Sequence, residues 1–319
     1  MIIMYYIFKK TNELIENEMS QIRALFEEVF KKPMTIEQFE QKFEKNQSGF
    51  SYHGLMIDEE KIVGCYSAIP YKYNYFGKEV VFALSVDTMI AEKYRGNPFN
   101  LKKMANLVYD SLKADGIPFV FGFPNDNVYL VRKKILKWQD IGKLDFYILP
   151  INIGAIKSKL AFLNIFSKIF AGLTNILAGP KIADTVNYGI EKVNNKVFRD
   201  GRYDDSYSVK MLCKDGYFVY KIYDEEGVRT AYIIDVYPLS KYNLENSIKE
   251  LYSKEKNNID LIMYVGNLDF SVKNLFKVPE KYRPKNVYMS GKILDDTLVD
   301  ERVFDLKNWN VNLSNYDVR

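Results

Sequence analysis

Hydrophobic and polar positions follow two different periods in the first part of the chain. In residues 14–30 apolar side chains recur three and four positions apart, which predicts an amphipathic helix. Thr35 followed three positions later by Gln38 predicts the capping box that opens a second helix. Residues 52–56 and 62–73 alternate with a period of two and are separated by an acidic turn, so they are predicted to be neighbouring strands.

The same two periods continue to residue 150. Residues 80–90 form a long apolar run that predicts a strand, and residues 101–112 carry apolar side chains on one helical face. Residues 119–123 are almost entirely apolar, as in a buried central strand. A helix over residues 128–136 and a strand over 145–149 follow. Alternating strands and helices of this kind predict an α+β domain.

A similar but shorter order of elements returns after residue 200. Residues 218–223 and 228–236 read as strands around a second acidic turn, residues 244–252 as a helix, and residues 259–265 as a buried strand. The repetition indicates two unequal halves, of which the second lacks the loop-and-helix unit described below. The predicted division is a first domain, an apolar helical linker and a second, smaller domain, at residues 1–150, 151–200 and 201–319.

The linker permits two interpretations. Residues 151–179 have few charges and apolar side chains at helical spacing, which is typical of a helix packed between two domains. The alternative is a peripheral helix over residues 156–178 that lies on a membrane surface with its lysines toward lipid headgroups. No run of eighteen uncharged apolar residues occurs, so no spanning helix is expected.

The composition restricts the chemistry. His53 is the only histidine, and Cys65 and Cys213 are the only cysteines. Three such residues cannot form a four-ligand zinc site, so no metal is expected, and a serine triad could use only His53. Two distant cysteines give no disulfide framework, which favours a reducing, cytoplasmic environment. The net charge of +4, from 45 basic and 41 acidic residues, indicates no nucleic-acid partner. The oligomeric state is left open.

One segment combines a strand, a turn and the start of a helix with features of an anion site. It reads Asp-Thr-Met-Ile-Ala-Glu-Lys-Tyr-Arg-Gly-Asn-Pro-Phe-Asn over residues 87–100. A loop before a helix offers unpaired amides and the positive end of the helix dipole, which together favour phosphate or pyrophosphate. Arg95 and Lys93 add positive charge. A plain surface turn is the simpler alternative.

With its surroundings, this segment resembles the acetyl-CoA loop of the GNAT acyltransferase superfamily, which reads Arg/Gln-x-x-Gly-x-Gly/Ala between a strand and a helix. Arg95 matches the first position, and residues 122–129 resemble the strand end and helix start that border the pantetheine arm. Asp-Thr-Met followed by Tyr-Arg-Gly is similar to a bacterial branch in which two GNAT-like halves are often fused. Trp309 and residues 315–318 are similar to the tail of that branch.

The resemblance implies a mixed central sheet flanked by helices, followed by a degenerate GNAT-like second domain. It implies acetyl-CoA as cosubstrate, held in a cleft where the strands at 80–90 and 119–123 separate. The residues that the resemblance places at the cosubstrate are Met89, Ile90, Arg95, Gly96, Asn97, Phe99, Asn100 and Asn127.

The loop departs from the family pattern at two positions. The family glycine falls on Pro98, which has no N–H, and the second small residue falls on Asn100. Both changes suit a helix start, with Asn97 as N-cap and Pro98 at the first helical position. The amides of Phe99 and Asn100 remain as expected donors. One lost hydrogen bond to a charged group corresponds to roughly ten- to hundred-fold weaker binding.

Acyl transfer needs a base for the amine and an acid for the leaving thiolate. In the resembling fold, Asp87 lies on the strand whose end faces the thioester, which makes it the candidate base; a structural carboxylate is the alternative. Family members often place a tyrosine acid in the helix after the asparagine segment, and Tyr129 is the tyrosine available there. Asn127 is interpreted as a pantetheine or substrate contact; the alternative is an N-cap of the helix that begins at residue 128, and the two roles are compatible. His53 and Cys65 lie within predicted strands and are interpreted as structural.

These expectations support three hypotheses. The first is an acetyl-CoA-dependent N-acyltransferase acting on a small amine, such as an amino sugar or a cell-envelope precursor. The second is a non-catalytic or weakly CoA-binding protein of the same fold, which Pro98 and Asn100 favour. The third is a tandem aminoacyl-type transferase of peptidoglycan, for which no heptad arm is present.

Overall fold

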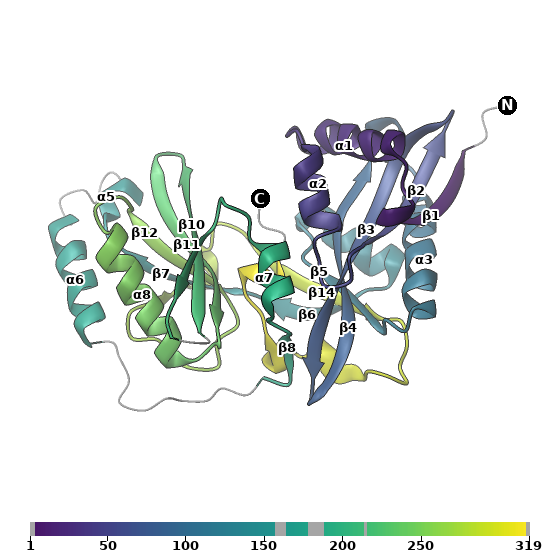
Figure 1. Cartoon of the computed structure of the whole chain (residues 1–319). Coiled ribbons are helices and arrows are strands. Elements are labelled where there is room, and N and C mark those ends of the chain that lie inside the picture. Colours follow the sequence, from purple (N-terminus) through teal and green to yellow (C-terminus); the bar gives the residue numbers. More distant parts are fainter. Residues whose placement is uncertain (1–3, 157–163, 178–187, 214–215, 317–319) are drawn as a thin grey trace. The chain divides into compact units, whose positions relative to one another are not determined.

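The computed structural model describes residues 4–156, 164–177, 188–213 and 216–316, and it divides into two compact units (Figure 1). Each unit is assembled from separate stretches of the chain. The first contains Met1–Lys143, Gly189–Asp204 and Val287–Asn308. The second contains Leu144–Tyr188, Asp205–Asn286 and Trp309–Arg319.

The first unit is built on a mixed sheet in the order β1-β2-β3-β4-β5-β14-β6, with β8 (Ile190–Lys192) pairing with the far end of β3. All neighbours along this order are antiparallel except β4 and β5, which are parallel. The strands span β1 Tyr5–Lys10, β2 Tyr52–Asp58, β3 Lys61–Tyr75, β4 Lys78–Ile90, β5 Phe119–Gly122, β6 Gln139–Lys143 and β14 Tyr288–Ile293.

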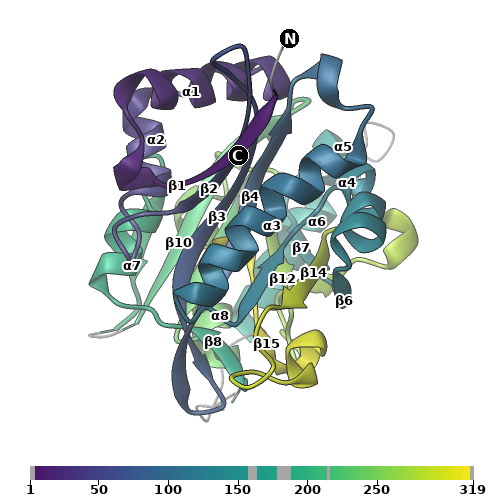
Figure 2. The ribbon, with the colours of Figure 1, turned by 90° about the vertical axis from the view of Figure 1, so that its right-hand side faces the viewer.

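Helices cover both faces of this sheet, α1 and α2 on one face and α3 and α4 on the other (Figure 2). The predicted capping box is confirmed, because the Thr35 side chain accepts a hydrogen bond from the Gln38 amide and caps α2. The apolar face predicted for α3 is also confirmed, since its members are buried against the sheet. The helices of this unit are α1 Glu16–Phe30, α2 Ile36–Phe43, α3 Pro98–Ala114, α4 Asp126–Val131, the π-helical turn η3 Arg132–Leu136 and α7 Lys196–Arg202.

Close contact between α3 and the sheet depends on Gly54 in β2. A Cβ atom added at this position would overlap the backbone carbonyl of Met104, so only glycine allows the helix to approach this closely. Met104 itself is fully buried beside Tyr52 and Tyr66. Helix α3 is therefore held close against β2, next to the edge strand β1.

The second unit has a six-stranded sheet in the order β13-β7-β12-β11-β10-β9. Helix α8 (Lys241–Glu255) connects β11 to β12, and these two strands are parallel. The core of this unit is formed by buried residues of β11, β12 and α8. The strands span β7 Asp145–Pro150, β9 Ser208–Met211, β10 Tyr217–Glu225, β11 Val228–Tyr237, β12 Leu261–Gly266 and β13 Phe276–Lys277. The α+β class, with a mixed sheet flanked by helices and a second sheet, is confirmed.

The structure divides the chain differently from the three continuous segments expected from the sequence. β7, expected to close the first domain, pairs with β12 of the second sheet. β14, expected in the second domain, lies between β5 and β6 of the first sheet. Strand pairing between distant segments causes the difference, and sequence periodicity carries no information about such pairing.

Helix α6 (Asn164–Leu177) lies in the segment that was interpreted as either a core helix or a membrane-surface helix. Ala171 is buried, whereas Ile169, Phe170, Leu173 and Ile176 are exposed, Ile176 at 77%. The interpretation over residues 156–178 also covers residues 157–163 and 178, which lie outside the described residues. Within the described ranges, no helix combines the length and apolar character needed to cross a bilayer.

The tail of the chain is part of the second unit up to Tyr316. Trp309 is fully buried, and Asn312 donates a hydrogen bond from Nδ2 to Asp235 Oδ1 over 3.0 Å. Asp317 and Val318, which completed the expected tail motif, lie outside the described residues.

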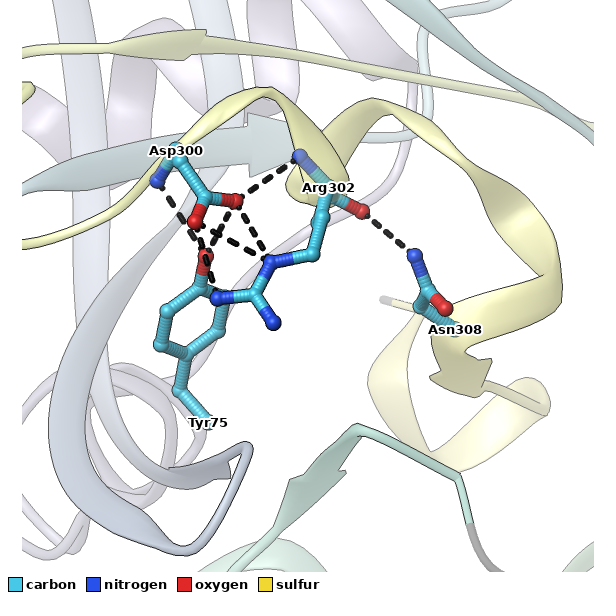
Figure 3. Close-up of polar contacts among 4 residues, drawn as sticks. All are labelled: Tyr75, Asp300, Arg302 and Asn308. Carbon is cyan, nitrogen blue, oxygen red and sulfur yellow. Dashed lines mark hydrogen bonds and ion pairs between the residues drawn. The ribbon is translucent and has the colours of Figure 1, made fainter.

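A polar network fastens the end of β3 to the segment after β14 (Figure 3). Tyr75 donates from its hydroxyl to Asp300 Oδ1 over 2.8 Å, and Arg302 reaches the same carboxylate with Nε at 2.9 Å. Asn308 donates to the backbone carbonyl of Arg302 over 2.9 Å. Arg302 holds the pKa of Asp300 well below its usual range by hydrogen bonding. This network ties the returning C-terminal segment to the first sheet.

Candidate active site

The site begins at a distortion in β4. Against β3 the pairing register shifts, so that Tyr66 faces two residues, Asp87 and Thr88. Asp87 adopts a left-handed φ of 42°, an uncommon conformation for a residue other than glycine. Bulges of this kind re-aim side chains and are frequent beside active sites.

β4 and β5 part close to this bulge. Their parallel pairing covers Phe82–Leu84 on β4, after which β5 ends at Gly122 while β4 continues to Ile90. Residues 85–90 are therefore paired with β3 on one edge and extend past β5 on the other. A strand edge that continues beyond its neighbouring strand can pair with an extended ligand.

The predicted helix start is confirmed. The Asn97 side chain caps α3 by accepting a hydrogen bond from the Phe99 amide over 3.0 Å, with Pro98 at the first helical position. The Asn100 amide donates to the Asn97 carbonyl over 3.1 Å. The amides of Phe99 and Asn100, which the sequence left as candidate phosphate donors, are therefore both used within the cap. Among the described residues, those of Gly96 and Asn97 have no hydrogen-bond acceptor.

Arg95 lies where a ligand can reach it. Its Nε donates to the backbone carbonyl of Ile90 over 2.8 Å, which holds the guanidinium beside the end of β4. Arg95 and Gly96 are both exposed, and no atom approaches the open side of Gly96 within 4 Å. The loop thus presents one anchored cation and two amides at the N-terminus of a long helix, an arrangement suited to an anion.

Asn100 fixes this loop rather than facing a ligand. Its side chain is 3% exposed, donates from Nδ2 to the Tyr94 carbonyl over 3.0 Å, and accepts from the Tyr6 hydroxyl over 2.8 Å. The Tyr94 hydroxyl donates to Asp58 on β2. The residue that departs from the family pattern therefore connects the loop to β1.

The remaining predicted cosubstrate residues have mixed surroundings. Met89 is buried opposite Cys65 of β3, so its side chain belongs to the core. Ile90 is partly buried and is the last residue of β4. Asn127 is exposed within α4. The alternative that made Asn127 an N-cap is wrong, because Asn125 accepts from the Val128 amide and caps the helix one residue earlier.

Asp87 forms an ion pair with Lys42 of α2, with 2.7 Å between Oδ2 and Nζ. The two side chains are 5% and 12% exposed. The neighbouring residue, Thr88, instead contacts η3 on the other face of the sheet. Asp87 thus lies on the α1 and α2 face, beyond the end of β5.

Tyr129, the candidate acid, shares no partner with Asp87 in the contacts that follow. Its hydroxyl donates to Asp140 Oδ1 over 2.8 Å and accepts from Lys133 over 3.3 Å, and its ring stacks on Tyr288 with 4.2 Å between centroids. Asp140 belongs to β6, three places from β4 in the sheet. At about 4.8 Å per strand this amounts to roughly 14 Å, so the structure does not bring Tyr129 and Asp87 together.

His53 is a structural residue. It is fully buried, with Nδ1 2.9 Å from Ser67 Oγ and Nε2 2.9 Å from Thr11 Oγ1. Burial lowers the pKa of His53 to about 3, so the imidazole is neutral at neutral pH. Burial also raises the pKa of the Cys65 thiol to about 12, which keeps it protonated and unreactive.

The sequence analysis missed a buried arginine at the separation of β4 and β5. Arg132 is 5% exposed, and its Nη2 donates to Ser85 Oγ over 3.2 Å and to Thr88 Oγ1 over 3.3 Å. Its guanidinium lies 4.5 Å from the centre of the Trp138 ring. No sequence signal distinguishes Arg132 from Lys133 and Lys134, because burial depends on packing.

Comparison with known proteins agrees with this geometry. Residues 10–133 match the family described as an acetyltransferase (GNAT) domain. The match contains the β4 bulge, the loop and α3, and it includes Arg132. No curated protein sequence matches the chain.

Solved structures share the fold over most of the chain. A conserved protein of Enterococcus faecalis V583, described as a probable N-acyltransferase, is 13% identical, with a TM-score of 0.59 over 92% of this chain and 73% of that one. A GCN5-related N-acetyltransferase from Anabaena variabilis is 14% identical, with a TM-score of 0.58 over 91% and 73%. The N-myristoyltransferase of Saccharomyces cerevisiae, solved with myristoyl-CoA, is 10% identical, with a TM-score of 0.50 over 90% and 78%. At these identities the likeness shows a common fold.

Proposed function

We propose that the protein is an acyl-CoA-dependent N-acyltransferase, because residues 10–133 match the acetyltransferase (GNAT) domain family. The narrower proposal is that acetyl-CoA is the donor and a small amine the acceptor, such as an amino sugar or a cell-envelope precursor. One observation carries the proposal. The loop with exposed Arg95 and the amides of Gly96 and Asn97 follows the part of β4 that extends past β5.

In this proposal the loop binds the pyrophosphate of the cosubstrate. The Gly96 and Asn97 amides donate to its oxygens, the positive end of the α3 dipole favours its charge, and Arg95 adds a full positive charge. The extended pantetheine arm then follows residues 85–90 toward the bulge. This places the thioester carbonyl near Asp87 and Thr88.

The transfer step begins with attack of the neutral acceptor amine on the thioester carbonyl. A C–N bond forms and the C–S bond breaks, so the amine loses a proton and the departing thiolate gains one. Asp87 is the proposed acceptor of the amine proton, directly or through one water, while Lys42 orients its carboxylate. Tyr129 is not used as the acid in this scheme, because its hydroxyl donates to Asp140. Water supplies the proton to the thiolate.

Ligand-induced stabilisation tests the proposal. Acetyl-CoA is expected to raise the melting temperature of the full chain, because a ligand that binds only the folded state stabilises it. Arg95→Glu is expected to weaken binding by at least roughly ten- to hundred-fold, the value of one lost charge-assisted hydrogen bond. Lys32→Glu makes the same charge change at an exposed position in the segment between α1 and α2, and is expected to bind like wild type.

Thiol release from acetyl-CoA in the presence of an amine panel then tests catalysis. Stabilisation by acetyl-CoA without thiol release for any amine would favour the non-catalytic alternative. Absence of any shift at millimolar acetyl-CoA would refute the enzyme proposal.

We also propose a peripheral membrane contact through α6, because Ile169, Phe170, Leu173 and Ile176 are exposed together on that helix. Lys168 and Lys273 are exposed on the same unit and complement anionic lipid. Flotation with vesicles containing anionic lipid should carry the protein upward, and Ile176→Asp should abolish this. Equal behaviour of the variant and wild type would contradict the contact.

A further inference from the structure

A buried cation lies where β4 and β5 separate, and no carboxylate neutralises it among the described residues. Nη2 of Arg132 contacts the two hydroxyls of Ser85 and Thr88, while Nε and Nη1 have no hydrogen-bond partner in the described chain. Burial lowers the pKa of Arg132, while the hydroxyls of Tyr66 and Tyr109 act in the opposite direction. Since an arginine remains protonated, the folded protein holds an uncompensated positive charge.

Burying an unpaired charge is costly, so such a group is retained where another requirement outweighs stability. The indole of Trp138 lies against the guanidinium and offers only a weak compensation through its ring. A ligand with a negative charge would supply the missing partner. The unpaired donors Nε and Nη1 would then gain an acceptor.

The surroundings of Nη1 contain a second unpaired polar group. A Cβ atom at Gly122 would lie 2.7 Å from Nη1, so the absence of a side chain there lets the guanidinium reach the end of β5. Ser290 of β14 pairs directly with Gly122 and therefore projects its side chain to the same face of the sheet. Ser290 is fully buried, and its Oγ has no partner among the described residues.

We propose that Arg132, with Ser290 Oγ beside it, binds the carboxylate of a ligand seated where β4 and β5 separate. This inference rests on the proposed function, which places the thioester along residues 85–90. The carboxylate belongs either to the acyl group of a dicarboxylic acyl-CoA or to an amino-acid acceptor. Both ligands present the same planar carboxylate, whose oxygens accept hydrogen bonds from a guanidinium and a hydroxyl.

The pyrophosphate is not the partner of Arg132 in this arrangement. Arg132 contacts Ser85 and Thr88, which lie five and two residues before Ile90, so at about 3.4 Å per residue these contacts are roughly 17 Å and 7 Å along the strand from its end. The loop has its own cation, Arg95, and its own amides. Arg132 therefore serves a different anionic group, close to the acyl end of the cosubstrate.

The test compares matched ligand pairs on the full chain. For the donor, succinyl-CoA is compared with butyryl-CoA, which has the same carbon number without the carboxylate. For the acceptor, alanine is compared with ethylamine in the presence of acetyl-CoA. In wild type we expect the carboxylated ligand of one of these two pairs to be preferred over its neutral partner. Its affinity, or its kcat/KM, is expected to be roughly ten- to hundred-fold higher.

The variants are Arg132→Met, Arg132→Lys and Ser290→Ala. Arg132→Met is expected to lower binding or kcat/KM for the carboxylated ligand far more than for its neutral partner, so that the preference is lost. Arg132→Lys is expected to retain part of the preference, and Ser290→Ala to reduce it. Because Arg132→Met removes an uncompensated buried charge, we expect it to fold, and its unliganded melting temperature is measured in parallel.

The outcomes separate this inference from the proposed function. If acetyl-CoA stabilises the protein through Arg95 but neither carboxylated ligand is preferred, the carboxylate site is refuted and the proposed function stands. An equal effect of Arg132→Met on charged and neutral ligands also refutes it. If no acyl-CoA binds, while succinate or alanine alone stabilises wild type and not Arg132→Met, the carboxylate site stands and the proposed function fails.

Discussion

Replacement of Asn100 tests whether the anion-binding loop is held in place from beneath. Asn100→Ala removes one hydrogen bond to the Tyr94 carbonyl and one to the Tyr6 hydroxyl, at 3.0 and 2.8 Å in the structure. The Asn100 side chain is almost fully buried, so the Tyr94 carbonyl loses its partner without full access to water. Arg95, the next residue, is expected to lose its fixed position.

Each neutral hydrogen bond contributes about 0.5–1.5 kcal/mol net, so two give about 1–3 kcal/mol. Tyr6 is partly exposed and can find water, which favours the middle of this range, about 2 kcal/mol. Asn100→Asp keeps the shape but replaces the Nδ2 donor by an oxygen facing the Tyr94 carbonyl. It is therefore expected to destabilise more than Asn100→Ala.

The assay is urea unfolding followed by circular dichroism, with the transition of the first unit fitted separately because two units need not unfold together. Acetyl-CoA affinity is measured on the same variants. Asn97→Ser, which keeps a side-chain oxygen for the α3 cap, is the matched control and is expected to stay within about 0.5 kcal/mol of wild type. A free energy of unfolding for Asn100→Ala within about 0.5 kcal/mol of wild type, with unchanged affinity, would refute the reasoning.

Three further outcomes are expected. The folded-state pKa of His53, about 3, lies below the unfolded value of about 6.5, so the unfolded chain binds the extra proton and stability falls as pH drops below about 6.5. Between pH 6.5 and 5 this amounts to about 1.6 kcal/mol, and equal slopes for wild type and His53→Gln in urea titrations at several pH values would contradict it. Asp87→Asn in a Lys42→Met background is expected to lower kcat about 10²–10⁴-fold with unchanged acetyl-CoA affinity, and a kcat similar to that of Lys42→Met alone would exclude Asp87 as the base. Tyr129→Phe is expected to change kcat less than about threefold, because its hydroxyl is occupied by Asp140, and a drop of a hundredfold or more would restore Tyr129 as the acid.

Local features of the site were predictable because they depend on a few neighbouring residues. Asn97 and Pro98 define a helix start by their own backbone preferences, and the structure has that start. The Thr35–Gln38 capping box follows from the same kind of local rule. The position of Arg95 in an exposed loop between a strand and a helix likewise follows from the order of elements.

Roles that depend on a partner elsewhere in the chain were not predictable. Tyr129 was the candidate acid because of its position in the helix after the asparagine segment. In the structure its hydroxyl donates a hydrogen bond to Asp140. Asn127 and Asn125 are both suitable caps by type, and the register of the helix selects Asn125. The backbone amide of Asn100 was a candidate phosphate donor, but in the structure it donates to the Asn97 carbonyl.

The sequence by itself determined the hydrophobic periods, the helix caps and the loop around Arg95 between a strand and a helix, because these arise from interactions among residues a few positions apart. Only the tertiary structure decided that β14 lies beside β5 and that β7 joins the other sheet. It also decided that Nε and Nη1 of Arg132 and Oγ of Ser290 are buried without hydrogen-bond partners among the described residues. Strand order and burial depend on free energies summed over distant segments. A surface lysine such as Lys134 and the buried Arg132 therefore look alike in the sequence, and only folding separates them.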